Sequence, residues 1–296
     1  MAYIPKKMIE EKLLQFLKED IDYGDITSDL VPNVQVTAIL FAKQKGIVCG
    51  IRFVKILLES LGVSVTSHQE EGNEVKKGDR ILELRGNSRT ILVSERTVLN
   101  LIMRLSGIAT QTHKLVKKVE QSGQDIIIAA TRKTTPGFRY FEKYAVLIGG
   151  GDSHRWSLSD TILIKENHLR LFMEKIITKQ VMKKASFSKK IEIEVENLDE
   201  LKTALILSPD IIMLDDFKIK DIQEAIKIVQ QTSNPVKPLI EVSGGISEKN
   251  IDEYLIPGIN IISIGALTHS IKSIDFSLKI EDRLGSEDKG EDFNGN

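Results

Sequence analysis

Basic side chains follow two short apolar runs of the sequence, a placement that is typical of sites for anionic ligands. Arg132 and Lys133 follow the run at 126–130, and Lys165 follows a second run of the same kind. A charge at the end of an apolar run is costly unless a counter-ion offsets it. Arg155 adds a second guanidinium, whose planar fork matches a carboxylate with two hydrogen bonds at any working pH. Two carboxylates on one small ring would use both arginines.

Carboxylates and glycines follow the remaining apolar runs. Glu194 and Asp215 are suited to hold Mg²⁺ together with substrate phosphates, although a structural ion pair with Lys165 or Arg132 explains them equally well. The last two runs lead into turns whose backbone N–H groups favour phosphate binding, and tight turning is the ordinary alternative. The residues of these two turns are Ser243, Gly244, Gly245, Gly265 and Ala266.

His154 precedes Arg155 and follows three glycines at 149–151, a stretch that would let the backbone approach a ligand closely. A histidine by itself is often a structural hydrogen-bonding residue, but the neighbouring cations favour a binding role here.

Two other functions fit the same residues. One is a Schiff-base lyase, in which Lys165 at a strand end would form the covalent bond to the substrate. The other is a barrel that binds a phosphosugar without catalysing a reaction.

Six apolar, β-branched runs separated by helical stretches must position these side chains. Such runs are typical of parallel strands covered on both faces, with helices outside them, for example at 169–184 and 219–231. In a parallel α/β barrel the loops after the strands open on one face, which gathers the working groups into one cleft. Periodicity alone leaves an open doubly wound sheet as an alternative. The six runs lie at 126–130, 161–164, 191–195, 211–214, 239–242 and 261–264.

The first third of the chain has a mixed pattern. Helical spacing is expected at 7–18 and 53–61, and an alternating strand at 36–42. From 94 to 121 apolar residues recur at helical spacing, and the pair Ser106 and Gly107 predicts a break that would act as a domain hinge.

Composition excludes several classes of protein. The 296 residues carry a formal charge of -1 and are 41% hydrophobic, which supports a real core and argues against a general nucleic-acid binder. The single cysteine, Cys49, rules out an intramolecular disulfide and is expected to fill the core. With no run of roughly 20 apolar residues, we expect a soluble cytoplasmic protein. The charged, glycine-rich tail at 285–296 is expected to be disordered.

Taken together, the motifs of the chain resemble those of quinolinate phosphoribosyltransferase, also called nicotinate-nucleotide pyrophosphorylase (carboxylating). The resemblance runs from about Glu19 to Leu278 in family order. It is carried by Glu19-Asp20, 24–27, Glu95-Arg96-Thr97, 105–110, 131–137, 149–151, His154-Arg155, 163–165, Asn167-His168, 194–196, 213–215 and 265–270.

The resemblance implies an N-terminal α/β sandwich domain at 1–110, completed by 271–284, and an incomplete α/β (TIM-like) barrel at 111–270. It implies a homodimer or a ring of dimers with shared active sites, in which Arg96 reaches the neighbouring site. The implied reaction joins quinolinate to 5-phosphoribosyl 1-diphosphate with Mg²⁺, giving nicotinate mononucleotide, diphosphate and CO2. Lys133, Glu194 and Asp215 would be catalytic, and the two carboxylates would also hold the metal. Lys133 would serve either the pyridine acid or the phosphates. The implied quinolinate ligands are Arg96, Arg132, Lys133, His154, Arg155 and Lys165.

Four residues depart from the family pattern and open a second possibility. Ser153 and Asp216 stand where asparagine is usual, and Trp156-Ser157 replaces a stretch that normally contains glycine. A bulky Trp156 would narrow the pocket, and the extra charge of Asp216 would alter anion or metal binding. The alternative is a paralogue of the kind associated with molybdenum uptake, which acts on a different acid.

Overall fold

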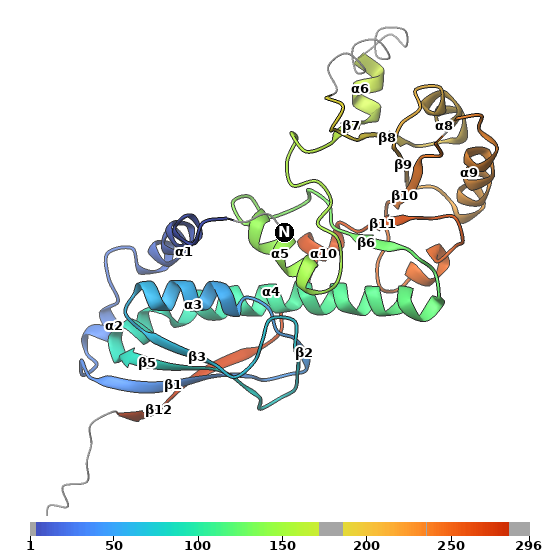
Figure 1. Cartoon of the computed structure of the whole chain (residues 1–296). Coiled ribbons are helices and arrows are strands. Elements are labelled where there is room, and N and C mark those ends of the chain that lie inside the picture. Colours follow the sequence, from blue (N-terminus) through green and yellow to red (C-terminus); the bar gives the residue numbers. More distant parts are fainter. Residues whose placement is uncertain (1–3, 172–185, 235, 284–296) are drawn as a thin grey trace, which may run out of the picture. The chain divides into compact units, whose positions relative to one another are not determined.

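The computed structural model describes residues 4–171, 186–234 and 236–283, which form two compact units (Figure 1). One unit consists of the chain up to Gly107 together with the chain from Lys272 onward, and the other is Ile108–Ile271. Most of the helix predicted at 169–184 and the whole tail at 285–296 lie outside the described residues. The predicted fold class, an α/β sandwich joined to an incomplete α/β barrel, is confirmed.

The first unit is built on a four-stranded antiparallel sheet in the order β12-β1-β5-β3. Its longest strands are rich in β-branched and large apolar residues, which pack well on a pleated surface. The closing strand comes from the end of the described chain, so the sheet joins segments far apart in sequence. The strands are β1 (Gln35–Ala42), β3 (Ser64–Ser67), β5 (Arg80–Asn87) and β12 (Phe276–Arg283).

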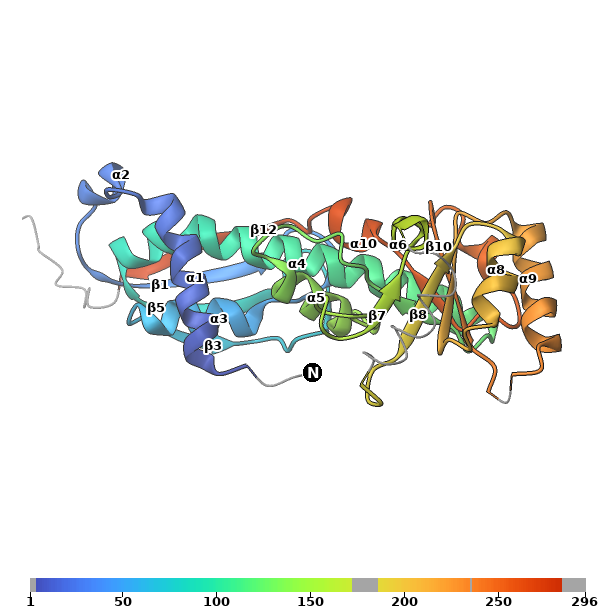
Figure 2. The same cartoon turned by 90° about the horizontal axis from the view of Figure 1, so that it is seen from above.

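Helices complete the first unit. Figures 1 and 2 show α3 (Ile51–Ser60) and the first part of α4 (Ser88–Ser122) on one face of the sheet. The helix α1 (Lys6–Ile21) packs against α3. A short helix, α2 (Ile26–Asp29), and a strand pair, β2 (Gly46–Ile47) with β4 (Glu74–Val75), fill the connections. No helix in the part of the chain described here is long and apolar enough to cross a membrane.

The predicted break at Ser106 and Gly107 is wrong, because α4 continues through both residues. Ser106 is fully buried, and its hydroxyl donates to the Cys49 carbonyl at 3.2 Å and accepts from the Cys49 N–H at 2.9 Å. A Cβ atom on Gly107 would lie 2.6 Å from the carbonyl oxygen of Lys272. The glycine therefore permits a close approach of two backbones, and one glycine costs a helix only about 1 kcal/mol. Cys49 is buried, as predicted.

The second unit contains a six-stranded parallel sheet in the order β6-β11-β10-β9-β8-β7. All six predicted runs form strands, with ends that differ from the prediction by at most a residue. The strands are β6 (Ile127–Ala129), β7 (Ile162–Ile164), β8 (Ile191–Val195), β9 (Ile211–Asp215), β10 (Leu239–Ser243) and β11 (Ile261–Ser263).

The strand order decides between the two architectures that periodicity left open. From β7 to β11 each strand pairs with the next one in the chain, and the first strand, β6, pairs with the last, β11. A doubly wound sheet reverses direction at an internal strand, whereas this order follows a closed ring with one gap. Within the described residues no pairing joins β6 to β7. The sheet is therefore an incomplete barrel.

Helices connect these strands, as expected for parallel pairing. The predicted helix at 219–231 is α9 (Ile219–Gln231), which lies beside α8 (Leu198–Leu205) on the outside of the sheet (Figure 2). The helix α5 (Arg139–Ile148) follows β6. Shorter helices are α6 (Glu166–Leu171), the 3-10 turn Ile251–Tyr254 and α10 (Ala266–His269).

Candidate active site

A cavity of about 300 Å³ lies at the carboxyl ends of the parallel strands in the second unit. Eight of the residues predicted from the sequence line it, which places the expected cations and carboxylates around one space. These eight are Arg132, Lys133, His154, Arg155, Lys165, Glu194, Asp215 and Ser243. The remaining lining residues are Ala130, Thr131, Leu163, Met213, Glu241 and Ser263.

Five predicted site residues are not part of this lining. Gly244 and Gly245 follow Ser243 in the turn after β10, and Gly265 with Ala266 follows β11. The Lys133 side chain passes close to Gly265, since a Cβ atom there would lie 3.0 Å from Lys133 Cδ. Arg96 is exposed on α4, in the first unit.

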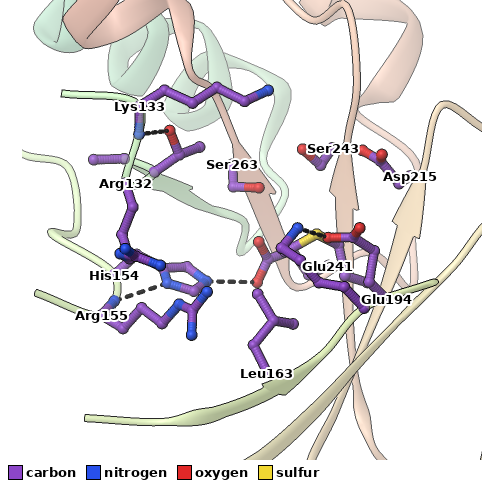
Figure 3. A pocket seen from close by; sticks show the side chains of 14 residues that line it. Arg132, Lys133, His154, Arg155, Leu163, Glu194, Asp215, Glu241, Ser243 and Ser263 are labelled. Atoms are coloured by element: carbon purple, nitrogen blue, oxygen red, sulfur yellow. Dashed lines mark hydrogen bonds and ion pairs between the residues drawn. The ribbon is translucent and has the colours of Figure 1, made fainter. Parts of the chain in front are cut away.

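Two guanidinium groups form one side of the cavity. Figure 3 shows Arg132 and Arg155 on the side opposite Asp215 and Ser243. The Arg132 Nε atom is buried and has no hydrogen-bond partner among the described residues. Burial, and next the charge of Arg132, lower the pKa of Arg155. Two cations that disfavour each other in this way are arranged to receive an anion.

The segment that carries Arg155 is attached to the edge of β6. The Asp152 N–H donates to the Ile128 carbonyl at 2.8 Å, and the Ala130 N–H donates to the Asp152 carbonyl at 2.9 Å. The preceding glycines pack against the protein itself, since a Cβ atom on Gly151 would lie 2.8 Å from the Thr112 side chain in α4. The glycine run therefore fixes the path of this segment, in contrast to its expected approach to a ligand.

His154 has hydrogen bonds at both ring nitrogens. Its backbone has a φ of 52°, its Nδ1 atom accepts from the Arg155 N–H at 2.7 Å, and its Nε2 atom lies 3.2 Å from a Glu241 oxygen. Burial acts to lower the pKa of His154, but the hydrogen bond and charge of Glu241, with the charge of Glu192, raise it. In both the neutral and the charged form, Nε2 carries a proton and donates to Glu241. This geometry favours a positioning role for His154.

Glu192 and Glu241 are buried carboxylates that our sequence analysis missed. Both are fully buried, and neither Glu192 oxygen has a hydrogen-bond partner in the described part of the chain. Burial, and then the charge of Glu241, raise the pKa of Glu192 to about 7. With His154 they form a cluster whose possible ligand atoms lie within 4.8 Å of one another. The Nε2 atom of His154 lies 3.2 Å from a Glu241 oxygen and 3.7 Å from a Glu192 oxygen, so its proton faces both carboxylates.

Lys165 and Glu194 form a direct ion pair across β7 and β8. The alternative that the sequence left open, a structural ion pair, is therefore present for Glu194. The lysine remains partly exposed, with 43% of its side chain accessible, so a ligand can still reach its ammonium group. The Lys165 N–H donates to His168 Nδ1 at 2.9 Å, which assigns His168 a local structural role.

The turns after β9 and β10 interlock beside the cavity. Ser243 pairs with Asp215 in register, and its carbonyl accepts from the Asp216 N–H at 3.0 Å. Gly244 has a φ of 100°, and a Cβ atom there would lie 2.6 Å from the Asp216 nitrogen. A side chain at this position would separate the two turns.

We expect Gly244→Ala to destabilise the protein more than Gly245→Ala. Gly245 also has a positive φ, of 59°, but a Cβ atom there would meet no atom within 4 Å. The second change should cost only the left-handed strain of roughly 1 kcal/mol, and the first should add a backbone clash. Chemical denaturation of both variants measures the difference. Equal losses would contradict the close packing of the two turns.

Trp156 does not line the cavity. Its ring lies beside Tyr140 of α5, with 6.0 Å between the ring centroids. Its backbone N–H donates to Asp160 at 2.6 Å, and its carbonyl accepts from Arg139 at 3.2 Å. The departure from the family pattern at this position is thus accommodated against α5, away from the lining.

The incomplete barrel, with cations and carboxylates around one cavity at its strand ends, defines a barrel protein with a site for small anionic molecules. Residues 25–106 match the N-terminal domain, and residues 108–279 the C-terminal domain, of quinolinate phosphoribosyl transferase. The chain belongs to this family.

Named relatives agree over nearly the full length. A probable nicotinate-nucleotide pyrophosphorylase (carboxylating) of Methanocaldococcus jannaschii is 46% identical over 281 residues, covering 92% of this chain and 99% of the relative. The human nicotinate-nucleotide pyrophosphorylase (carboxylating) is 33% identical, covering 90% and 89%. The solved nicotinate-nucleotide pyrophosphorylase of Francisella tularensis is 40% identical with a TM-score of 0.84, covering 94% of this chain and 98% of that one.

Proposed function

We propose that this protein transfers the phosphoribosyl group of 5-phosphoribosyl 1-diphosphate to quinolinate, giving nicotinate mononucleotide, diphosphate and CO2. The paired guanidiniums of Arg132 and Arg155 at the end of the barrel support the proposal most strongly. Two fixed forks on one side of a small cavity suit the two adjacent carboxylates of quinolinate. Family membership supports the same reaction.

In this proposal the pyridine acid occupies the cationic side. Arg155 and Arg132 each bind a carboxylate. Lys165 binds the acid when its ion pair with Glu194 loosens. Leu163 and Met213 line the same cavity and offer apolar contact to the ring faces. His154 fixes the Arg155 backbone through the bond to Nδ1, in preference to contacting the acid itself.

The phosphorylated sugar occupies the side formed by β9, β10 and β11. The turns at Ser243 to Gly245 and at Gly265 would present backbone N–H groups to its 5-phosphate. Lys133 is assigned to the sugar phosphates, because its side chain passes Gly265 and points away from Arg132 in Figure 3.

Mg²⁺ fits the carboxylates at the ends of β8 and β9. Asp215 lines the cavity, and its carboxylate has no hydrogen bond or ion pair among the described residues, so hard oxygen ligands are available. Glu194 contributes an oxygen beside its ion pair with Lys165. When bound, the ion would neutralise the charge that develops on the leaving diphosphate.

The reaction then proceeds in two steps, formation of the bond to ribose and loss of CO2. The ring nitrogen attacks the anomeric carbon as the bond to diphosphate breaks, and Glu194 and Asp215 stabilise positive character on the ribose. When the neighbouring carboxylate departs as CO2, the electron pair of the broken bond stays on the ring carbon, where the adjacent positively charged nitrogen stabilises it. A proton from solvent completes the product.

A homodimer is also proposed, in which Arg96 of one subunit reaches the site of the other. Its exposure on α4 is compatible with that role. We further propose a cytoplasmic location, because the single cysteine, Cys49, is buried and unpaired.

The proposal is tested by incubating the protein with Mg²⁺, the diphosphate sugar and quinolinate labelled with ¹³C in the 2-carboxyl group. We expect one labelled CO2 for each nicotinate mononucleotide, and no product from nicotinate. If the diphosphate sugar stabilises the protein against heat but quinolinate does not and no product forms, the chain is a paralogue that acts on another acid. That outcome would give Ser153, Trp156, Ser157 and Asp216 a role in specificity.

A further inference from the structure

Lys143 is the largest polar side chain that is fully buried in the described part of the chain. It lies in the middle of α5 and is 0% exposed, among the apolar residues of that helix. No carboxylate among the described residues forms an ion pair with it. A buried ammonium without a carboxylate partner is costly, so its retention points to a specific task.

The ammonium group faces the backbone of the segment that carries His154 and Arg155. Lys143 Nζ donates to the Ser153 carbonyl and, at 2.7 Å, to the Arg155 carbonyl. It also lies 5.8 Å from the centre of the Trp156 ring, within reach of a cation–π interaction. The carbonyls on both sides of His154 are therefore held by one atom.

Holding these carbonyls determines where the neighbouring side chains point. His154 has a left-handed backbone, which is strained for a residue that is not glycine. With the carbonyls before and after it fixed toward α5, the His154 and Arg155 side chains line the cavity. Arg139 of the same helix donates to the Trp156 carbonyl, which extends the attachment by one residue.

We propose that Lys143 is a positioning residue, whose ammonium group fixes the 153–156 backbone against α5 so that Arg155 presents its guanidinium to the pyridine acid. The inference rests on the proposed function, because Arg155 must bind the acid for its orientation to matter. Trp156 covers the ammonium on one side, which gives this departure from the family pattern a role in the same contact.

The charge environment makes this contact sensitive to pH. Burial, and then the charge of Arg139, lower the pKa of Lys143 to about 8, while Asp152 and Asp160 act to raise it and Arg155 to lower it. Above this pH the amine still donates hydrogen bonds, but they lose the strength that a charge gives them. The Michaelis constant for quinolinate should therefore rise by a few-fold as the pH passes through this range.

Lys143→Met tests the inference, with Lys118→Met as a matched control. Lys118 also donates to a backbone carbonyl, that of Glu248, and pairs with Asp252, but it does not line the cavity. We expect Lys143→Met to raise the Michaelis constant for quinolinate at least about tenfold, while that for the diphosphate sugar stays within about twofold. A folded Lys143→Met protein with the kinetics of Lys118→Met would overturn the proposal.

The fluorescence of the single tryptophan offers a second test. It needs no substrate, and it can be measured on the wild-type protein. Trp156 is the only tryptophan of the chain, so its fluorescence reports on the group beside its ring. The wild-type protein should show a change in emission near pH 8, and Lys143→Met, if folded, should lack it. A wild-type titration curve identical to that of folded Lys143→Met would overturn the placement of the ammonium. If the wild-type protein makes no nicotinate mononucleotide, the proposed function fails instead, and the titration still tests Lys143.

Discussion

Replacing Arg155 with alanine should lower kcat/KM for quinolinate by about 100- to 10,000-fold while the protein stays folded. A hydrogen bond to a charged group contributes roughly 1.5 to 3 kcal/mol, and the guanidinium is proposed to make two. Each 1.36 kcal/mol of transition-state stabilisation corresponds to about tenfold in rate. Steady-state kinetics with each substrate varied in turn measures the loss.

Stability should respond quite differently to the same substitution. Burial and the charge of Arg132 already disfavour the Arg155 cation. Removing the Arg155 guanidinium therefore relieves its repulsion with Arg132. We expect the free energy of unfolding to change little or to rise. Arg155→Lys keeps the charge but not the fork, and should recover only a small part of the activity. Unfolding of the alanine variant, or full activity in it, would show that Arg155 serves the fold and not the acid.

Replacing Asp215 with asparagine should lower kcat by at least about 100-fold, which corresponds to roughly 2.7 kcal/mol. The carboxylate lines the cavity and is proposed both to stabilise the ribose cation and to bind Mg²⁺. The concentration of Mg²⁺ needed for half-maximal activity should rise as well. Metal titrations followed by product formation measure both effects.

The neighbouring residue provides the control for this prediction. Asp216→Asn removes a charge of the same kind one residue later, and asparagine tolerates the φ of 57° found there. Asp216 is exposed and does not line the cavity. We expect its activity within about threefold of the wild type. Equal losses of activity in the two variants would show that the total negative charge of this region matters. They would contradict a specific role for the Asp215 carboxylate at the end of β9.

The strands of the barrel could be predicted because a parallel strand covered on both faces leaves a continuous apolar run in the sequence. The ends of those runs then located Arg132, Lys165 and Asp215, since every strand end opens on the same face. The apolar runs alone could not show whether the sheet closes into a barrel. That depends on the pairing of β6 with β11, which joins residues far apart in the sequence.

Glu192 and Glu241 could not be found from the strand ends, because both lie in strand interiors. A signal was available: each is a charged residue inside an apolar strand, at Ile-Glu-Ile and Ile-Glu-Val. A buried carboxylate in such a place needs a partner. The partner of Glu241 is His154, which lies 87 residues earlier in the sequence, so only the fold reveals it.

Lys143 shows the same limit in a helix. A lysine within a helical pattern is ordinarily assigned to the solvated face. Its neighbours Tyr144 and Ala145 are also buried, so the residue pattern of α5 does not distinguish its faces. The contact to the Ser153 and Arg155 carbonyls depends on how the glycine run directs the chain back along α5. The break expected at Gly107 failed for a related reason, since a glycine required for close packing has the same sequence signal as a glycine that ends a helix.

A crystal structure with quinolinate bound tests the central claim most directly, namely that the cavity at the strand ends holds a pyridine dicarboxylate between the two arginines. We predict one carboxylate on Arg155 and the other on Arg132, with the Trp156 ring still against Lys143 and outside the cavity. Quinolinate bound elsewhere, or a cavity closed by the Trp156 ring, would contradict the account.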